Sequence, residues 1–227
     1  MKKTITRRHI LFLVLSLVLV AIIAYGVSTG CCQTEGLTSV EVREYEGVDL
    51  SSINAFRENS IKGSQEIDIE SYRLRITGLV ANSANYTYDE VLNRYQHYKK
   101  VVTLDCVEGW SVTILWEGVL VKDLLAEAEP LANAKVLIFH AFDGYTTSLP
   151  IDYIIDNDIL MAYKMNDVIL PPERGFPFQL AAESKWGYKW IKWITEIELS
   201  DDDNYRGYWE SRGYSNSADL DDNFFGD

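Results

Sequence analysis

Short runs of alternating apolar and polar residues begin near residue 70 and predict strands. In YRLRITG, residues 72–78, every second residue from Tyr72 to Ile76 is apolar, the pattern of a strand with one buried face. VVTLDCV, residues 101–107, alternates in the same way, and its apolar face ends in Cys106. We therefore expect Cys106 to point inward at the end of its strand.

Helix and turn signals separate these strands. Thr87 is followed three residues later by Glu90, a capping box that predicts a short helix over the residues that follow. Further elements are expected from apolar runs and turn residues: a helix near 121–127; strands at 135–142, 145–150 and 190–199, the last with Ile191, Trp193, Ile197 and Leu199 on one face; and a hairpin about Asn166 and Asp167. Strands dominate with short helices between them, so we predict a single α+β domain.

The N-terminus has a different pattern. Residues 10–27 carry no charge and follow Lys2, Lys3, Arg7 and Arg8, which is typical of a secretory signal or a membrane anchor. The adjacent arginines fit a twin-arginine export signal. We assign 1–30 to this segment and 31–49 to a polar connector, and we expect an extracytoplasmic protein.

The fate of this segment stays open between retention as a membrane anchor, lipidation at Cys31 and release after cleavage. VSTGC, residues 27–31, places small residues before Cys31, and this motif is the reason to consider lipidation there.

Charge excludes one class of partner. The formal net charge is -13, and the four basic residues before residue 33 leave 17 basic against 34 acidic residues for the rest. Such a domain repels phosphate backbones, so we predict no nucleic-acid binding. The 47% of hydrophobic residues nevertheless predicts a packed core.

Cys106 is the only cysteine after residue 32, which excludes a disulfide framework. A lone inward cysteine is most often a small core residue. A soft metal is an alternative partner for the thiol, but structural zinc is poorly supported because the only histidines beyond the N-terminal segment are His97 and His140. A third possible role of Cys106 is that of a catalytic nucleophile with His140 as its base.

A locally basic stretch lies between residues 171 and 192. It holds Arg174, Lys185, Lys189 and Lys192 against Glu173 and Glu183, with Gly175 and Gly187 among them. Cations with glycines that permit close backbone approach suit an anionic phosphate group. An ordinary solvated strand and loop is the alternative.

Together these residues resemble the sulfite oxidase-like family of molybdopterin-dependent oxidoreductases, with a closer likeness to the exported catalytic subunits of protein-methionine-sulfoxide reductases. The resemblance covers about residues 51–214 in the family's order: SSINAF, YRLRITG, LDCVEGWSVTILWEGVLVKDLL, DGYTTSLP, ILMAYKMNDVILPPERGFPFQL, KWGYKWIKWITEIEL and GYWESRGY. It implies a sulfite oxidase-like molybdopterin-binding fold over 50–214. The composition of residues 215–227 predicts an acidic C-terminal tail.

The resemblance also implies a site. Cys106 matches the thiolate that binds molybdenum, with tungsten as the alternative metal. The positions that match those around the pterin and its phosphate are Asn54, Arg57, Glu58, Ala141, Arg174, Gln179, Trp190, Ile191 and Lys192. The family commonly has arginine in place of Gln179, and asparagine or histidine in place of Arg174.

By the same resemblance we expect oxygen-atom transfer at sulfur, with a small or protein-borne sulfoxide such as methionine sulfoxide as substrate. Electrons would come singly from a membrane haem subunit or a cytochrome, because the chain has no CxxCH motif and no cysteine cluster of its own. The short region after Leu199 favours a monomer. Sulfite oxidation and a non-catalytic binding protein that keeps the fold are the alternatives.

Overall fold

The computed structural model describes residues 41–226. The predicted signal or anchor, Cys31 and most of the connector lie outside these residues. The described residues form one compact unit. None of the helices in the described part is long and apolar enough to cross a membrane.

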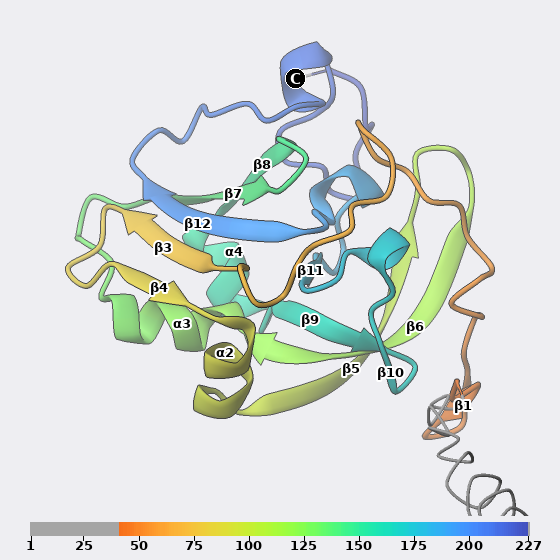
Figure 1. Ribbon diagram of the computed structural model, residues 1–227. Helices are drawn as coiled ribbons and strands as arrows, with labels where there is room; N and C mark the ends of the chain where they lie inside the picture. The colour runs from red at the N-terminus through yellow and green to blue at the C-terminus, as the bar shows by residue number, and fades with distance from the viewer. Residues whose placement is uncertain (1–40, 227) are drawn as a thin grey trace, which may run out of the picture. The chain divides into compact units, whose positions relative to one another are not determined.

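Two five-stranded sheets form the body, and they lie one above the other in Figure 1. The lower sheet has the order β10-β9-β6-β5, with β11 also paired to β9. Its strands are β5 (His97–Asp105), β6 (Ser111–Leu120), β9 (Leu160–Met165), β10 (Val168–Ile169) and β11 (Gln179–Ala181). All of these pairings are antiparallel.

The upper sheet has the order β4-β3-β12-β7-β8, and its one parallel pairing joins β12 to β3. Its strands are β3 (Leu74–Gly78), β4 (Ala84–Tyr86), β7 (Val136–Ala141), β8 (Thr146–Pro150) and β12 (Ile194–Ser200). A separate hairpin of β1 (Glu44–Tyr45) and β2 (Val48–Asp49) precedes the body.

Short helices connect the strands. They are α2 (Tyr88–Arg94), α3 (Val121–Ala128) and α4 (Ile151–Asp156), with single 3₁₀ turns η1 (Pro172–Arg174), η2 (Gly187–Lys189) and η3 (Glu210–Arg212). Thr87 caps α2 in the predicted capping box, because its side chain accepts from the backbone of Glu90 while that carboxylate accepts from the backbone of Thr87. The strand-rich α+β class predicted from the sequence is confirmed.

One apolar core joins the two sheets. Leu74 and Ile76 of β3 contribute to it from the upper sheet, and Ile114 and Trp116 of β6 contribute from the lower one. All four side chains are fully buried. The alternation that predicted β3 therefore reports its buried face correctly, whereas β6 and α4 were not predicted.

One predicted strand begins later than expected. The pattern in 190–199 predicts a continuous strand, but β12 starts at Ile194. Trp193 has a left-handed backbone (φ 54°), and its indole donates to the carbonyl of Pro172 at 2.7 Å. Ile191 and Trp193 are buried as predicted, but in an irregular segment, because alternation reports burial and does not require a sheet.

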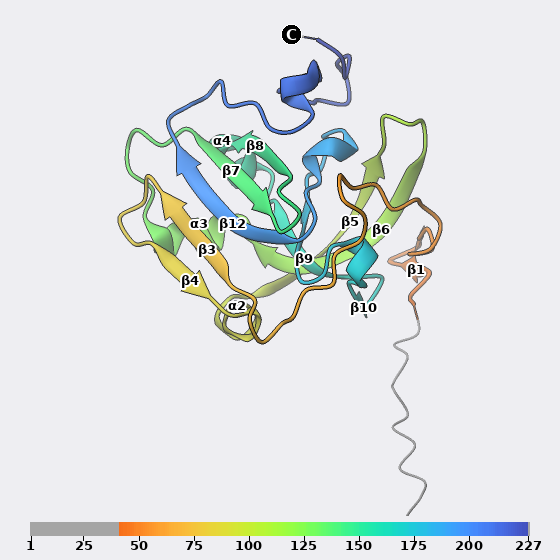
Figure 2. The same cartoon turned by 45° about the horizontal axis from the view of Figure 1, so that its top comes forward.

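The C-terminal segment, residues 201–226 after β12, packs against the body, although the composition of its last part predicts an acidic tail at 215–227. Ala218 is fully buried, the backbone of Ser215 donates to Phe224 at 3.1 Å, and Lys185 forms an ion pair with Asp219. Figure 2 shows this segment running over the end of the upper sheet near β8.

Candidate active site

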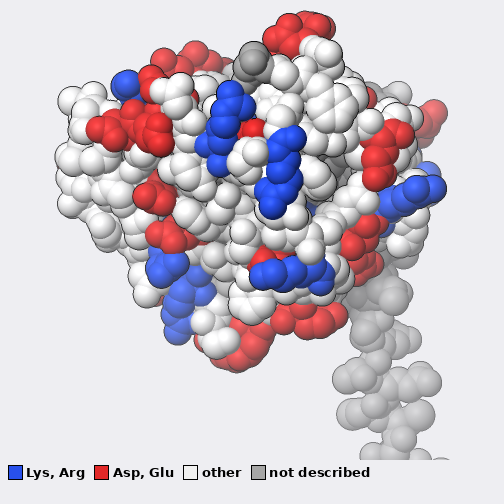
Figure 3. Space-filling view, turned by 90° about the horizontal axis from the view of Figure 1, so that it is seen from above, with Lys and Arg blue, Asp and Glu red and all other residues white. Residues whose placement is uncertain are grey.

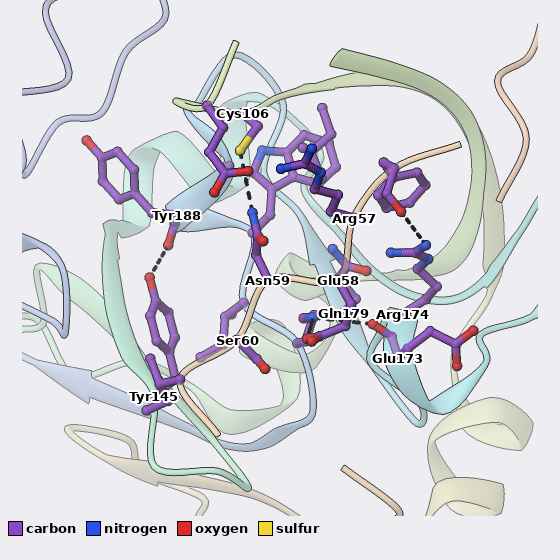
Figure 4. Close-up of a pocket in the computed structure, with 18 of the residues that line it drawn as sticks. Arg57, Glu58, Asn59, Ser60, Cys106, Tyr145, Glu173, Arg174, Gln179 and Tyr188 are labelled. Atoms are coloured by element: carbon purple, nitrogen blue, oxygen red, sulfur yellow. Dashed lines mark hydrogen bonds and ion pairs between the residues drawn. The ribbon is translucent and has the colours of Figure 1, made fainter. Parts of the chain in front are cut away.

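A cavity of about 470 Å³ opens where the ends of both sheets meet the C-terminal segment and the irregular stretch 53–63. Its volume lies in the range of small-molecule and cofactor sites. The wall includes Phe56, Arg57, Glu58, Asn59, Ser60, Leu104, Cys106, Glu108, Trp110, Asp143, Tyr145, Arg174, Gln179, Gly187, Tyr188, Trp190, Ile191, Lys192, Trp193, Trp209 and Tyr214. Figure 4 shows part of this wall.

Cys106 lies in the cavity wall immediately after β5. Its carbonyl accepts from the backbone of Gly109 and its N–H donates to the carbonyl of Trp110, both at 2.9 Å. These bonds close a tight turn that holds the half-buried thiol at the strand end. Burial raises the pKa of the Cys106 thiol.

The raised pKa and the surroundings of Cys106 do not fit a cysteine nucleophile, which needs a lowered pKa and an adjacent base. His140 is not part of the cavity wall. Its Nε2 lies 2.9 Å from the carboxylate of Glu198 on β12. The hypothesis that Cys106 is a nucleophile with His140 as its base is therefore wrong. Among residues 41–226 no group of three or more His, Cys, Asp or Glu side chains could hold a metal ion.

Lys192 lies in the same cavity wall, in the irregular segment that precedes β12. Its ammonium forms an ion pair with Glu58 at 2.7 Å and also lies 3.3 Å from the carbonyl of Glu173. Burial lowers the pKa of Lys192, and Glu58 opposes this effect. The pair brings together two predicted site residues that are 134 positions apart in the chain.

Arg174 ties the stretch that carries Glu58 to the body. It is 6% exposed, and its guanidinium donates to the carbonyls of Ile53 at 3.0 Å and Phe56 at 2.6 Å. The guanidinium carbon also lies 3.9 Å from the centre of the Phe56 ring, a cation–π contact. Burial lowers the pKa of Arg174.

Gln179 has the kind of orphaned atom that a bound group would satisfy. The side chain is 3% exposed, and its Oε1 is buried without a hydrogen-bond partner. Gly175 lies beside it with φ 98°, and a Cβ there would come within 3.0 Å of Lys192 and 3.2 Å of Gln179. Buried polar atoms without partners are rare in native proteins, so Gln179 indicates a ligand with a donor at this end of the cavity.

The structure brings eight of the ten predicted site residues to this cavity: Arg57, Glu58, Cys106, Arg174, Gln179, Trp190, Ile191 and Lys192. It does not bring Asn54 or Ala141 to the wall. Asn54 is exposed, and Ala141 is buried at the end of β7 among core residues.

Other wall residues were not found from the sequence. Asn59, Tyr145, Tyr188, Trp209 and Tyr214 belong to this set. Asn59 directly follows the predicted site residue Glu58, and this adjacency could have suggested Asn59 as a further site residue. Trp209 and Tyr214 come from GYWESRGY, a segment of the family resemblance in which no site residue was predicted.

The acidic body keeps basic side chains at this site. In Figure 3, Lys and Arg side chains lie in the middle of the face seen from above, and Asp and Glu side chains lie mostly around its margin. The cavity wall holds the cations of Arg57, Arg174 and Lys192 and the carboxylates of Glu58, Glu108, Asp143 and Glu173. An anionic group bound in this cavity would have these three basic side chains as its cationic partners.

The fold places one thiol in a cavity of the size that small molecules and cofactors occupy, and comparison with known proteins gives the family. A family model described as "Oxidoreductase molybdopterin binding domain" matches residues 61–209. The chain belongs to this family and is a molybdopterin-binding oxidoreductase.

Two relatives are similar over about two thirds of the chain. "Uncharacterized oxidoreductase YuiH" of Bacillus subtilis is 31% identical over 67% of this chain and 76% of its own length. "Putative protein-methionine-sulfoxide reductase subunit YedZ1" of Azospira oryzae is 32% identical over 66% of this chain and 57% of its own length.

A solved structure shares the fold. The sulfane dehydrogenase SoxCD of Paracoccus pantotrophus superimposes with a TM-score of 0.59 at 24% identity, covering 62% of this chain and 41% of that one. The sulfite oxidase-like molybdopterin-binding fold expected from the sequence is confirmed.

The residues of the cavity fit molybdopterin. The pterin cofactor carries a phosphate and hydrogen-bonding ring edges, and the cavity offers the cations of Arg174 and Lys192 together with the unsatisfied amide of Gln179. The missing side chain of Gly175 lets its backbone pack closely against Lys192 and Gln179. The thiol of Cys106 is a soft ligand suited to the metal.

Proposed function

We propose that this chain is an exported or membrane-anchored molybdenum enzyme that reduces sulfoxides, with methionine sulfoxide, free or protein-borne, as its substrate. The observation that carries the proposal is the shared cavity of the Cys106 thiol and the basic residue Lys192, with the orphaned Gln179 between them in the chain. The name of the relative YedZ1 supports the choice of substrate.

In this proposal Cys106 would bind the metal, and Arg174, Gln179 and Lys192 would hold the pterin and its phosphate. The bound cofactor supplies oxygen-atom transfer, in which the sulfoxide takes up two electrons and two protons to give a thioether and water. Trp110 and Phe56, whose ring centres lie 5.8 Å apart, form an apolar side of the cavity that excludes water and accepts the carbon substituents of the sulfoxide.

The electrons would arrive one at a time from a membrane haem subunit or a cytochrome. The N-terminal sequence supports a location next to such a partner, because its uncharged stretch suits a signal or an anchor. Fractionation of cells that express the full chain, or a chain lacking residues 1–32, tests this part. Recovery of the full chain in the cytoplasm would contradict it.

Sulfite oxidation is the second candidate, and Arg57 favours it. This exposed guanidinium lines the cavity and could attract a small anion. It also helps to lower the pKa of Glu108, after the larger effects of hydrogen bonds from Trp110 and Asn59.

One pair of assays separates the two candidates. Purified protein loaded with cofactor is given methionine sulfoxide with a reduced dye as electron donor, and separately sulfite with an oxidised dye as acceptor. Turnover of the sulfoxide that Cys106→Ser abolishes is the expected result. Turnover of sulfite alone would support the second candidate, and turnover of neither by metal-loaded protein would support a binding protein that keeps the fold.

A further inference from the structure

Asn59 is the residue whose side chain reaches the thiol of Cys106. Its amide Nδ2 lies 3.8 Å from the sulfur, and the two residues are 47 positions apart in the chain. Figure 4 shows this contact crossing the cavity wall from the stretch 53–63 to the end of β5. The backbone groups of Cys106 are already bonded within its own turn, so the amide adds a contact to the sulfur itself.

The position of Asn59 is fixed by its neighbours. Glu58, the preceding residue, is paired with the ammonium of Lys192. Three residues before Asn59, the carbonyl of Phe56 accepts from Arg174. A hydrogen bond from Asn59 is also among the causes that lower the pKa of Glu108, two residues after Cys106. The stretch is thus held to the body just before the sulfur contact, at Phe56 and Glu58.

We propose that Asn59 is a positioning residue that donates an N–H to the metal-bound sulfur of Cys106 and thereby raises the reduction potential of the bound metal. A hydrogen bond to a thiolate draws electron density away from the sulfur, which favours the more electron-rich, reduced state of the metal. Charge-assisted hydrogen bonds of this kind are stronger than neutral ones. The inference rests on the proposed binding of metal by Cys106.

The variant Asn59→Leu tests the inference, because it keeps a similar volume and removes the N–H donors. Asn59→Asp is the second variant, since it keeps the shape of the side chain and places a negative charge beside the sulfur. The matched control is Asn93→Leu, on the exposed surface of α2 and outside the cavity wall.

Two quantities are measured per bound metal: the midpoint potential in a redox titration, and the energy of the thiolate-to-metal charge-transfer band. We expect a lower potential and a shifted band for Asn59→Leu, a larger decrease for Asn59→Asp, and wild-type values for Asn93→Leu. A purely structural role for Asn59 would leave both quantities unchanged.

Asn59→Leu with the potential and band of the wild type would overturn the inference. Folded protein that binds no metal in either Asn59 variant would overturn it as well, because Asn59 would then act in loading and not on a bound centre. A failure of the proposed function would be recognised by different results: the wild-type protein would bind no metal, or Cys106→Ser would retain the metal.

Discussion

A buried ion pair between Lys189 and Glu210 joins the cavity wall to the C-terminal segment. Both side chains are fully buried, and the ammonium lies 2.7 Å from the carboxylate. Lys189 also donates to the carbonyl of Ser148 at 2.9 Å, and the hydroxyl of Thr147 donates to Glu210. Lys189 ends η2, whose residue Tyr188 lines the cavity. The perturbation Glu210→Ala removes the carboxylate from this cluster.

The expected loss of stability is large. Removing one partner of a buried pair leaves a charge that is poorly compensated in the interior, which costs about 3–5 kcal/mol. For a domain of this size each kcal/mol lowers the melting temperature by about 2–4 °C. Glu210→Ala should therefore melt roughly 10 °C below the wild type.

Urea and thermal unfolding of the purified protein measure this effect. The exposed pair of Lys135 and Asp203, at 2.9 Å, supplies the control, because Asp203→Ala removes a carboxylate that is solvated and should change stability far less. The double variant Lys189→Met with Glu210→Leu should recover much of the loss by replacing both charges with apolar groups. A loss below about 1 kcal/mol for Glu210→Ala would refute the reasoning.

Two further predictions concern the cavity. Gly175→Ala places a side chain at φ 98° and within 3.0 Å of Lys192. It should lower the free energy of unfolding in urea by about 1–2 kcal/mol and lower the pterin content of the purified protein. Unchanged pterin content would argue against phosphate binding beside Gly175. Burial raises the pKa of Cys106, so the thiol stays protonated at neutral pH. Its alkylation in metal-free protein should accelerate about tenfold per pH unit from pH 7 to 9, and a rate that levels off below pH 8 would show a lowered pKa.

Local patterns predicted much of the fold. The alternation around Leu74 and the capping box at Thr87 depend on neighbours within a few residues, and both were read correctly. The start of β12 was not, because the left-handed backbone of Trp193 is set by contacts to residues 172 and 175. Such contacts leave no trace in a period-two pattern.

The candidate site divides in the same way. The resemblance supplied Cys106, Gln179 and Lys192, which the structure gathers in one cavity. It did not supply Asn59 or Trp209, whose presence in the wall depends on how two irregular segments pack. The alternation of apolar and polar residues predicted only that Cys106 points inward. The residues that surround its sulfur could be identified only from the three-dimensional structure.

The central claim is that Cys106 binds the metal of a molybdopterin cofactor in this cavity. Metal and pterin analysis of purified wild-type protein and of Cys106→Ser tests it most directly. The account predicts about one metal per chain and a thiolate charge-transfer absorption for the wild type, and loss of both from a folded Cys106→Ser variant. Wild-type protein that folds in cofactor-replete cells without metal, or a variant that keeps the metal and the absorption, would contradict it.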